Sequence, residues 1–148
     1  MSQRLDYGKI IPDAMKALGS VHTYVAKSGL PRDLIDLVYL RVSLINGCAY
    51  CIDLHTRDLL KGGMKIEKVA LVPVYWEATS FFTEQERAAL AWAESLTLVS
   101  ETKAPDDVYN AVAKQFDQKQ LADLTVAISL MNTYNRLAIG FRRGPEPK

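Results

Sequence analysis

The sequence predicts an all-α fold in one domain, residues 1–148. Apolar residues recur at intervals of three and four along nearly the whole chain, which is the period of one face of a helix. Most prolines and glycines stand between these periodic stretches, where helices begin and end. The composition agrees with this, because a chain that is 49% hydrophobic and 24% charged is typical of a globular domain with a core.

The first two helices are expected at residues 13–27 and 33–44. Pro12 suits the first turn of the earlier helix, and Gly29 follows its end. Pro31 opens the later helix. Because its apolar residues leave little polar surface, we expect this second helix to lie at the centre of the fold.

The rest of the chain is expected to form five more helices, at residues 48–60, 67–72, 83–98, 106–116 and 119–141. Gly62 and Gly63 end the first of them. Thr83 and Glu86 form a capping box at the start of the third, because each side chain can bond the backbone N–H of the other. The last helix is the longest, and its apolar residues follow one face.

Charge and hydropathy argue against two classes of function. The formal net charge is +1 and the basic residues are scattered, so the chain lacks the basic surface of a nucleic-acid-binding protein. No stretch approaches the roughly 18 apolar residues of a membrane span, and residues 1–9 lack the apolar core of a secretory signal. We therefore expect a cytoplasmic protein that binds neither nucleic acid nor membrane, with a mobile tail at residues 144–148.

Several of the expected helices are apolar over more than one face. In a domain of this size such surface is typical of contact with a second copy of the chain, so we expect a homo-oligomer. The alternative is that the additional apolar faces pack within a single subunit.

Cys48 and Cys51 are the only two cysteines, and His55 follows one helical turn later. A redox dithiol, a metal site and a structural disulfide could each explain such a close pair. A structural disulfide is the weakest explanation, because the stabilisation from a cross-link grows with loop length and this loop is minimal. In a reducing compartment a close pair is more often catalytic, redox-sensing or metal-binding.

Helix geometry places Cys48, Cys51 and His55 on one face at the start of a helix. An ordinary thiol with a pKa of about 8.5 is only about 3% thiolate at pH 7, and lowering that pKa by two units takes roughly 2.7 kcal/mol. A helix terminus offers about 0.3–1 kcal/mol, so the thiol needs a proton acceptor, and His55 is in position to be one. The other histidine, His22, has no such neighbours and is interpreted as structural or exposed.

Residues 41–56 resemble the core motif of the alkylhydroperoxidase AhpD-like family, within the carboxymuconolactone decarboxylase superfamily. The resemblance rests on the cysteine pair, the histidine four residues later and the preceding Arg-Val-Ser and Asn-Gly residues. Residues 86–94 and 135–138 resemble later segments of single-domain members, so the likeness covers most of the chain.

The resemblance implies an antioxidant, thiol-dependent peroxidase whose helical subunits assemble into trimers or hexamers. Cys51 would attack the hydroperoxide and become a sulfenic acid, Cys48 would be the proton donor and resolving thiol, and His55 would relay protons. The electrons would come from a dithiol reductant, which is a lipoylated protein for the best-known members. We expect no bound cofactor and no metal.

One residue departs from the family pattern. Asp36 stands where the family usually has a relay glutamate, twelve residues before the first cysteine. Its side chain is one methylene shorter, so a direct hydrogen bond to His55 could become water-mediated or fail. Asp36 is therefore either a weakened relay residue or a surface charge.

Other functions remain open at this level. Cys48, Cys51, His55 and Asp36 could bind zinc, although a single helix that carries both cysteines and the histidine is unlike the usual two-element zinc site. A lactone decarboxylase and a redox sensor or disulfide carrier are also possible. Helix-start electrostatics alone favours Cys48 as the reactive thiol, whereas the family pattern and the position of His55 favour Cys51.

Overall fold

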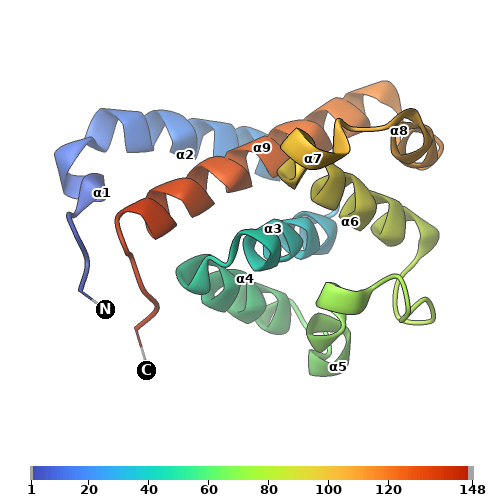
Figure 1. Cartoon of the computed structure of the whole chain (residues 1–148), viewed down its shortest axis with the longest axis horizontal. Helices are drawn as coiled ribbons and strands as arrows, with labels where there is room; N and C mark the ends of the chain where they lie inside the picture. Colours follow the sequence, from blue (N-terminus) through green and yellow to red (C-terminus); the bar gives the residue numbers. More distant parts are fainter. Residues whose placement is uncertain (1, 147–148) are drawn as a thin grey trace.

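The structure, a computed structural model, describes residues 2–146 (Figure 1). Its helical elements are α1 (Tyr7–Ile10), α2 (Pro12–Ala26), α3 (Arg32–Asn46), α4 (Ala49–Lys61), α5 (Ile66–Ala70), the 3-10 turn η1 (Val72–Val74), α6 (Glu84–Thr97), α7 (Val99–Thr102), α8 (Asp106–Ala113) and α9 (Gln118–Gly140). No strand occurs among residues 2–146, so the all-α prediction is confirmed for this part of the chain. Within the same range, no helix is long and apolar enough to cross a membrane.

The predicted helices are all present, and their ends agree within a few residues. Both α6 and α9 begin with a full capping box, which Thr83 and Glu86 form for α6 as predicted. The elements that the sequence did not predict are α1 and α7, each four residues long, and the three-residue turn η1. Helices this short have too few turns to show an apolar period, so the pattern could not reveal them.

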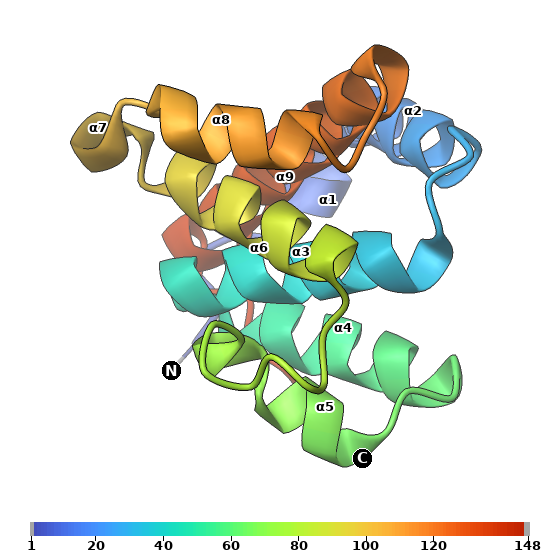
Figure 2. The same cartoon turned by 90° about the vertical axis from the view of Figure 1, so that its right-hand side faces the viewer.

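Helix α3 is the centre of the molecule. It packs against α4, α6 and α9, and Figures 1 and 2 show it enclosed by these helices. Leu37, Val38 and Val42 on α3 are fully buried. This confirms the central position predicted from its composition, and for α3 the additional apolar faces are covered within the subunit.

Two hydrophobic clusters lie on different sides of α3. The larger joins α3 to α2, α6, α8 and α9, with Val25, Val112 and Leu124 fully buried within it. The smaller joins α3 to α4, α5, η1 and α6 around Leu40 and Leu90. One face of α4 packs on this second cluster. Another face of α4 is therefore left to contact α9 and residues near the start of the chain.

An ion pair between buried Arg41 and partly exposed Glu94 connects the predicted motif to the later segment that resembles the same family. Arg41 is only 7% exposed, and its Nη2 lies 2.9 Å from Glu94 Oε2. The guanidinium also lies 5.5 Å from the centre of the Tyr75 ring. Arg41 and Glu94 therefore hold α3 against α6, because a buried charge is tolerated only when it is paired.

The two ends of the described chain lie close together. The Arg4 backbone N–H donates to Phe141 O at 2.9 Å, and Arg4 Nη1 donates to Gly140 O at 3.0 Å. Residues 144–146 are exposed and form no helix or strand, whereas residues 147–148 of the predicted mobile tail lie outside the described range. The segment after α9 is thus brought next to the first residues of the chain.

Candidate active site

A tight turn between α3 and α4 places the cysteine pair. Gly47 has a φ of +71°, which only glycine adopts without strain, and the following Cys48 N–H donates to Ser43 O at 3.0 Å. Cys48 is the N-cap of α4, which begins at Ala49, one residue later than predicted, and its Sγ accepts from the Cys51 N–H at 3.4 Å. Both sulfurs therefore lie at the N-terminal end of α4, where backbone N–H groups favour a thiolate.

Cys48 and Cys51 form a disulfide, with a Cα–Cα distance of 5.3 Å. Both are buried, at 1% and 4% exposure, and they pack against Ala138 of α9. A cross-link between residues this close in sequence stabilises the fold little through chain entropy. The disulfide is therefore best understood as the oxidised state of a redox dithiol.

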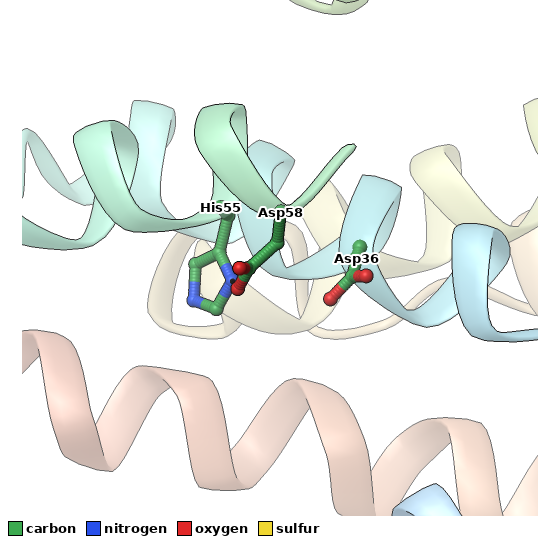
Figure 3. A group of neighbouring side chains, drawn as sticks. All are labelled: Asp36, His55 and Asp58. Atoms are coloured by element: carbon green, nitrogen blue, oxygen red, sulfur yellow. Dashed lines mark ion pairs between the residues drawn. The ribbon is translucent and has the colours of Figure 1, made fainter. Parts of the chain in front are cut away.

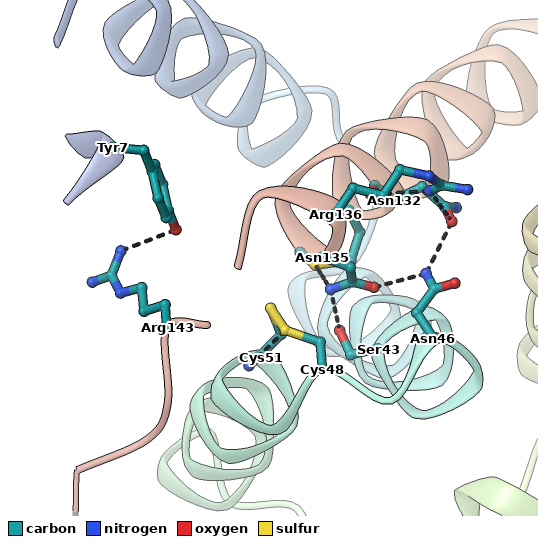
Figure 4. The surroundings of a disulfide bond; sticks show 10 residues. Tyr7, Ser43, Asn46, Cys48, Cys51, Asn132, Asn135, Arg136 and Arg143 are labelled. Carbon is teal, nitrogen blue, oxygen red and sulfur yellow. Dashed lines mark hydrogen bonds between the residues drawn. A yellow bond between two sulfur atoms is a disulfide. The ribbon is translucent and has the colours of Figure 1, made fainter. Parts of the chain in front are cut away.

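A hydrogen-bond network fixes α9 to the end of α3 beside the disulfide (Figure 4). Asn135 is completely buried, and its Nδ2 donates to Ser43 Oγ at 3.1 Å. Asn46 Nδ2 donates to Asn135 Oδ1 and to Asn132 Oδ1, each at 3.0 Å. One hydrogen-bond network thus joins Ser43 and Asn46 of the motif to Asn132 and Asn135 of α9, and it sets the position of the cysteines.

A cavity of about 280 Å³ opens beside the disulfide. Cys51 lines it, whereas Cys48 does not. Its walls come from α1, α2, α4, α9 and the segment after α9, and consist of Tyr7, Met15, Gly19, His22, Tyr50, Cys51, Leu54, His55, Met131, Tyr134, Ala138 and Arg143. Of the two cysteines, Cys51 is thus the one that a molecule in this cavity can contact.

His55 lies one turn after Cys51 and lines the same cavity, as the helical spacing predicted. It is only 5% exposed, and within residues 2–146 its Nδ1 makes no hydrogen bond. Burial lowers the pKa of His55 to about 4, the positive field of His22 adds to this, and Asp58 opposes it. His55 is therefore neutral at pH 7 and able to accept a proton.

Two carboxylates approach the Nδ1 side of His55 from different helices (Figure 3). Asp58 Oδ2 lies 4.0 Å from His55 Nδ1. A carboxylate oxygen of Asp36, a carboxylate oxygen of Asp58 and a ring nitrogen of His55 all lie within 4.8 Å of one another. The side chain of Asp36 is 14% exposed and pairs with Arg32 at 3.7 Å. Asp36 is thus a mostly buried neighbour of His55 and makes no direct hydrogen bond to it.

Sequence reasoning missed Asp58 and gave no role to His22. Asp58 follows His55 by three residues on α4, and this spacing places two side chains on the same face, so the signal was available. His22 is exposed, as expected, but it also lines the cavity, with its ring 6.1 Å from that of Tyr39. The position of His22 depends on how α2 packs, which no local pattern reveals.

The zinc site considered from the sequence does not form as a unit. The two cysteines are bonded to each other, and the ligand-type group that the structure gathers is Asp36, His55 and Asp58. Zinc bonds of roughly 2 Å place tetrahedral ligand atoms about 3.3 Å apart, closer than the spread of up to 4.8 Å in this group. This group therefore lacks both cysteines of the predicted zinc set and contains Asp58 in addition.

The buried carboxyl of Asp36 should make the stability of the protein depend on pH. Burial, followed by the charge of Asp58, raises the pKa of Asp36 to about 6 from 3.8, although Arg32 opposes both. The folded state therefore loses stability as pH rises from about 4 through 6. Asp36→Asn should raise the free energy of unfolding by roughly 1–2 kcal/mol at pH 8. This gain is smaller than the free energy equivalent to the whole pKa shift, because solvent screens the carboxyl. Urea titrations of both proteins from pH 4 to 8 measure this.

The gain from Asp36→Asn should shrink below pH 6 and be small at pH 4, because the folded state is then protonated and the unfolded state is titrating near its pKa of 3.8. Asp33→Asn is the matched control, because Asp33 lies on the same helix and is exposed. A gain of the same size in both variants, or one that does not change with pH, would show that burial of Asp36 is not its source.

Comparison with known proteins agrees with these observations. The sequence profile of the carboxymuconolactone decarboxylase family matches residues 12–95. YdfG, an uncharacterised protein of Bacillus subtilis strain 168, is 36% identical over 139 residues, which is 94% of each chain. The crystal structure of ATU0492 from Agrobacterium tumefaciens, a protein of unknown function suggested to be the antioxidant defence protein AhpD, superimposes with a TM-score of 0.93 at 39% identity, covering 99% of this chain and 100% of that one.

The same fold also supports other chemistry. The debrominase Bmp8 superimposes with a TM-score of 0.77 over 91% of this chain and 72% of its own, but only 19% of the residues are identical. Fold alone therefore does not identify the reaction. Because the family profile covers more than half of the sequence and ATU0492 matches along nearly all of it, the chain belongs to the carboxymuconolactone decarboxylase family as an AhpD-like member.

Proposed function

We propose that this protein is a thiol-dependent peroxidase that reduces hydroperoxides through the Cys48–Cys51 dithiol. One observation carries the proposal: Cys51 and His55 line the same cavity, while Cys48 lies outside it and is bonded to Cys51. An attacking thiol, a proton acceptor and a resolving thiol are the groups that this reaction requires. The suggested antioxidant role of ATU0492 supports the same function.

The reaction begins from the reduced protein. His55 accepts the proton of the Cys51 thiol, and the thiolate attacks the outer oxygen of the hydroperoxide, ROOH. The O–O bond breaks, Cys51 becomes a sulfenic acid, and the alkoxide takes the proton from His55 to leave as ROH. The thiol of Cys48 then attacks the sulfenic sulfur, which releases water and forms the disulfide.

Asp36 and Asp58 assist His55 in this scheme. A histidine with a pKa of about 4 is a weak base, and an ionised Asp58 already shifts that pKa upward. A pKa of about 6 lets Asp36 exchange a proton near neutral pH. Asp58 therefore stabilises the imidazolium when His55 holds the proton of Cys51, and Asp36 is close enough to take part in proton exchange.

A dithiol reductant closes the cycle by thiol–disulfide exchange, and its two sulfurs leave as a disulfide. The reductant we propose is a lipoylated protein, and the compartment is the cytoplasm. We also propose a homo-oligomer, a trimer or hexamer, because large apolar side chains remain exposed on several elements. Among them are Ile10, Tyr24, Ile66, Trp76 and Val99.

The test of the proposed function is steady-state turnover of the purified protein. Hydrogen peroxide and cumene hydroperoxide are supplied as oxidants, with dihydrolipoamide or a lipoylated protein as reductant. We expect reductant consumption in proportion to added peroxide, with one dithiol oxidised per peroxide reduced. If no peroxide is consumed with any dithiol although the disulfide is fully reduced, the protein is a redox sensor or decarboxylase and the proposal is wrong.

A further inference from the structure

The cavity beside Cys51 is apolar on most sides and polar or charged on the others. Met15, Leu54, Met131 and Ala138 give it an apolar interior, and Cys51 and His55 lie on one side. Arg143 is the one lining residue, among those described, that carries a permanent charge. A pocket of this kind selects a ligand with an apolar body and a single polar group at a fixed place.

Arg143 is held in place by its backbone and by aromatic side chains. The chain turns sharply after α9, where Arg142 has a φ of +56°, and the Arg143 N–H donates to Ala138 O at 2.9 Å. The guanidinium carbon lies 4.1 Å from the centre of the Tyr50 ring, and Nη1 donates to the Tyr7 hydroxyl oxygen at 3.4 Å (Figure 4). Two aromatic residues from distant parts of the sequence thus fix the position of this cation.

Arg143 forms no ion pair within residues 2–146, although the negative charge of Asp6 is near enough to raise its pKa. No carboxylate of residues 2–146 lies within 4.0 Å of its guanidinium, whereas Arg41, Arg57 and Arg32 each pair with one. A guanidinium has five N–H donors in a planar fork, so after the bond to Tyr7 it can still bind a carboxylate through two of them. The cation is therefore available to a ligand.

We propose that the cavity binds hydroperoxides of apolar carboxylic acids, with the carboxylate on Arg143, the hydrocarbon against the methionines and Leu54, and the peroxide group at Cys51. This inference rests on the proposed peroxidase function for the reaction, but the binding preference does not depend on it. A cavity of about 280 Å³ lies at the small end of ligand pockets, which suits an aromatic or short-chain acid. Neutral hydroperoxides of the same size bind without the charge pair, so their KM is higher.

A binding experiment tests the preference without any turnover. The oxidised protein is titrated with 4-phenylbutyrate and with its neutral isostere 4-phenylbutanamide, while amide NMR signals of Tyr50, Leu54 and Arg143 are followed. We expect the acid to bind several-fold more tightly than the amide, because the guanidinium makes a charge-assisted hydrogen bond to a carboxylate, and the exposure of Arg143 to solvent limits this gain. Arg143→Gln should reduce the affinity for the acid to that for the amide, and Arg142→Gln, one residue earlier and exposed, should leave it unchanged.

The kinetic counterpart compares cumene hydroperoxide with its ring-carboxylated derivative. Arg143→Gln should raise KM for the carboxylated substrate several-fold more than KM for the neutral substrate, and Arg142→Gln should leave the ratio of the two KM values unchanged. Equal affinity of the unmodified protein for acid and amide, or shifts that do not include the cavity residues, would overturn the inference even if the protein reduces peroxides. Tight, Arg143-dependent binding of the acid in a protein without peroxide turnover would instead refute the proposed function and leave the assignment of the ligand intact.

Discussion

Replacing Cys51 with serine should abolish peroxide reduction, with turnover reduced by at least about 10³-fold to the uncatalysed background. The reason is positional, because Cys51 is the sulfur that lines the cavity and lies one turn from His55. A serine hydroxyl does not react with peroxides at neutral pH, and Cys48 does not line the cavity and so cannot take the place of Cys51. The measurement is peroxide consumption by the reduced protein, in single and in multiple turnovers.

Cys48→Ser is the matched control for Cys51→Ser, because each variant removes one sulfur and the same disulfide. Cys48→Ser should lose multiple turnover, since no thiol resolves the intermediate, but should still reduce one equivalent of peroxide. Dimedone should then label Cys51 in Cys48→Ser and label nothing in Cys51→Ser. A sulfenic acid trapped on Cys48 would reverse the two roles, as helix-start electrostatics alone favours.

Replacing His55 with asparagine should slow the reaction of Cys51 with peroxide by roughly 10²–10³-fold at pH 7. The variant keeps a buried polar side chain but removes the group that accepts the thiol proton. Without this base, the rate depends on the small fraction of Cys51 that is thiolate at neutral pH. Stopped-flow measurement of single-turnover peroxide reduction between pH 6 and 10 gives the rate and its pH dependence.

The pH profile separates a proton acceptor from a packing residue. At pH values above about 8.5 an unassisted thiol ionises by itself, so the His55→Asn rate should rise toward that of the unmodified protein. A residue that only supports the cavity would lower the rate by the same factor at every pH. A pH-independent loss in His55→Asn would therefore falsify the assignment of His55 as base, whatever the size of the loss.

The carboxylates beside His55 predict a smaller, additional change in that profile. Asp36 is one methylene shorter than the glutamate of the family pattern, and Asp58 lies at the same imidazole nitrogen. Asp36 of α3 and Asp58 of α4 can therefore together perform the proton transfer that the single longer glutamate performs in the family pattern. Asp36→Asn should shift the lower limb of the pH–rate profile, and an unchanged profile and rate would exclude Asp36 from proton transfer.

The longer helices were predictable to within a few residues, because each depends on neighbours in sequence. The capping box of Thr83 and Glu86, the left-handed Gly47 and the apolar residues of α3 and α9 are local patterns with local causes. The common face of Cys51 and His55 follows from helix periodicity in the same way. These features required no knowledge of how one helix packs on another.

The sequence by itself determined the helical elements, the dithiol and the histidine one turn from it. Only the tertiary structure decided which sulfur faces the cavity, that Asp36 on α3 meets Asp58 on α4, and that Arg143 comes to lie on Tyr50 near the start of the chain. These contacts join residues up to 136 positions apart, as between Tyr7 and Arg143. Helix packing, which depends on the whole core, sets such contacts, so no local period in the sequence encodes them.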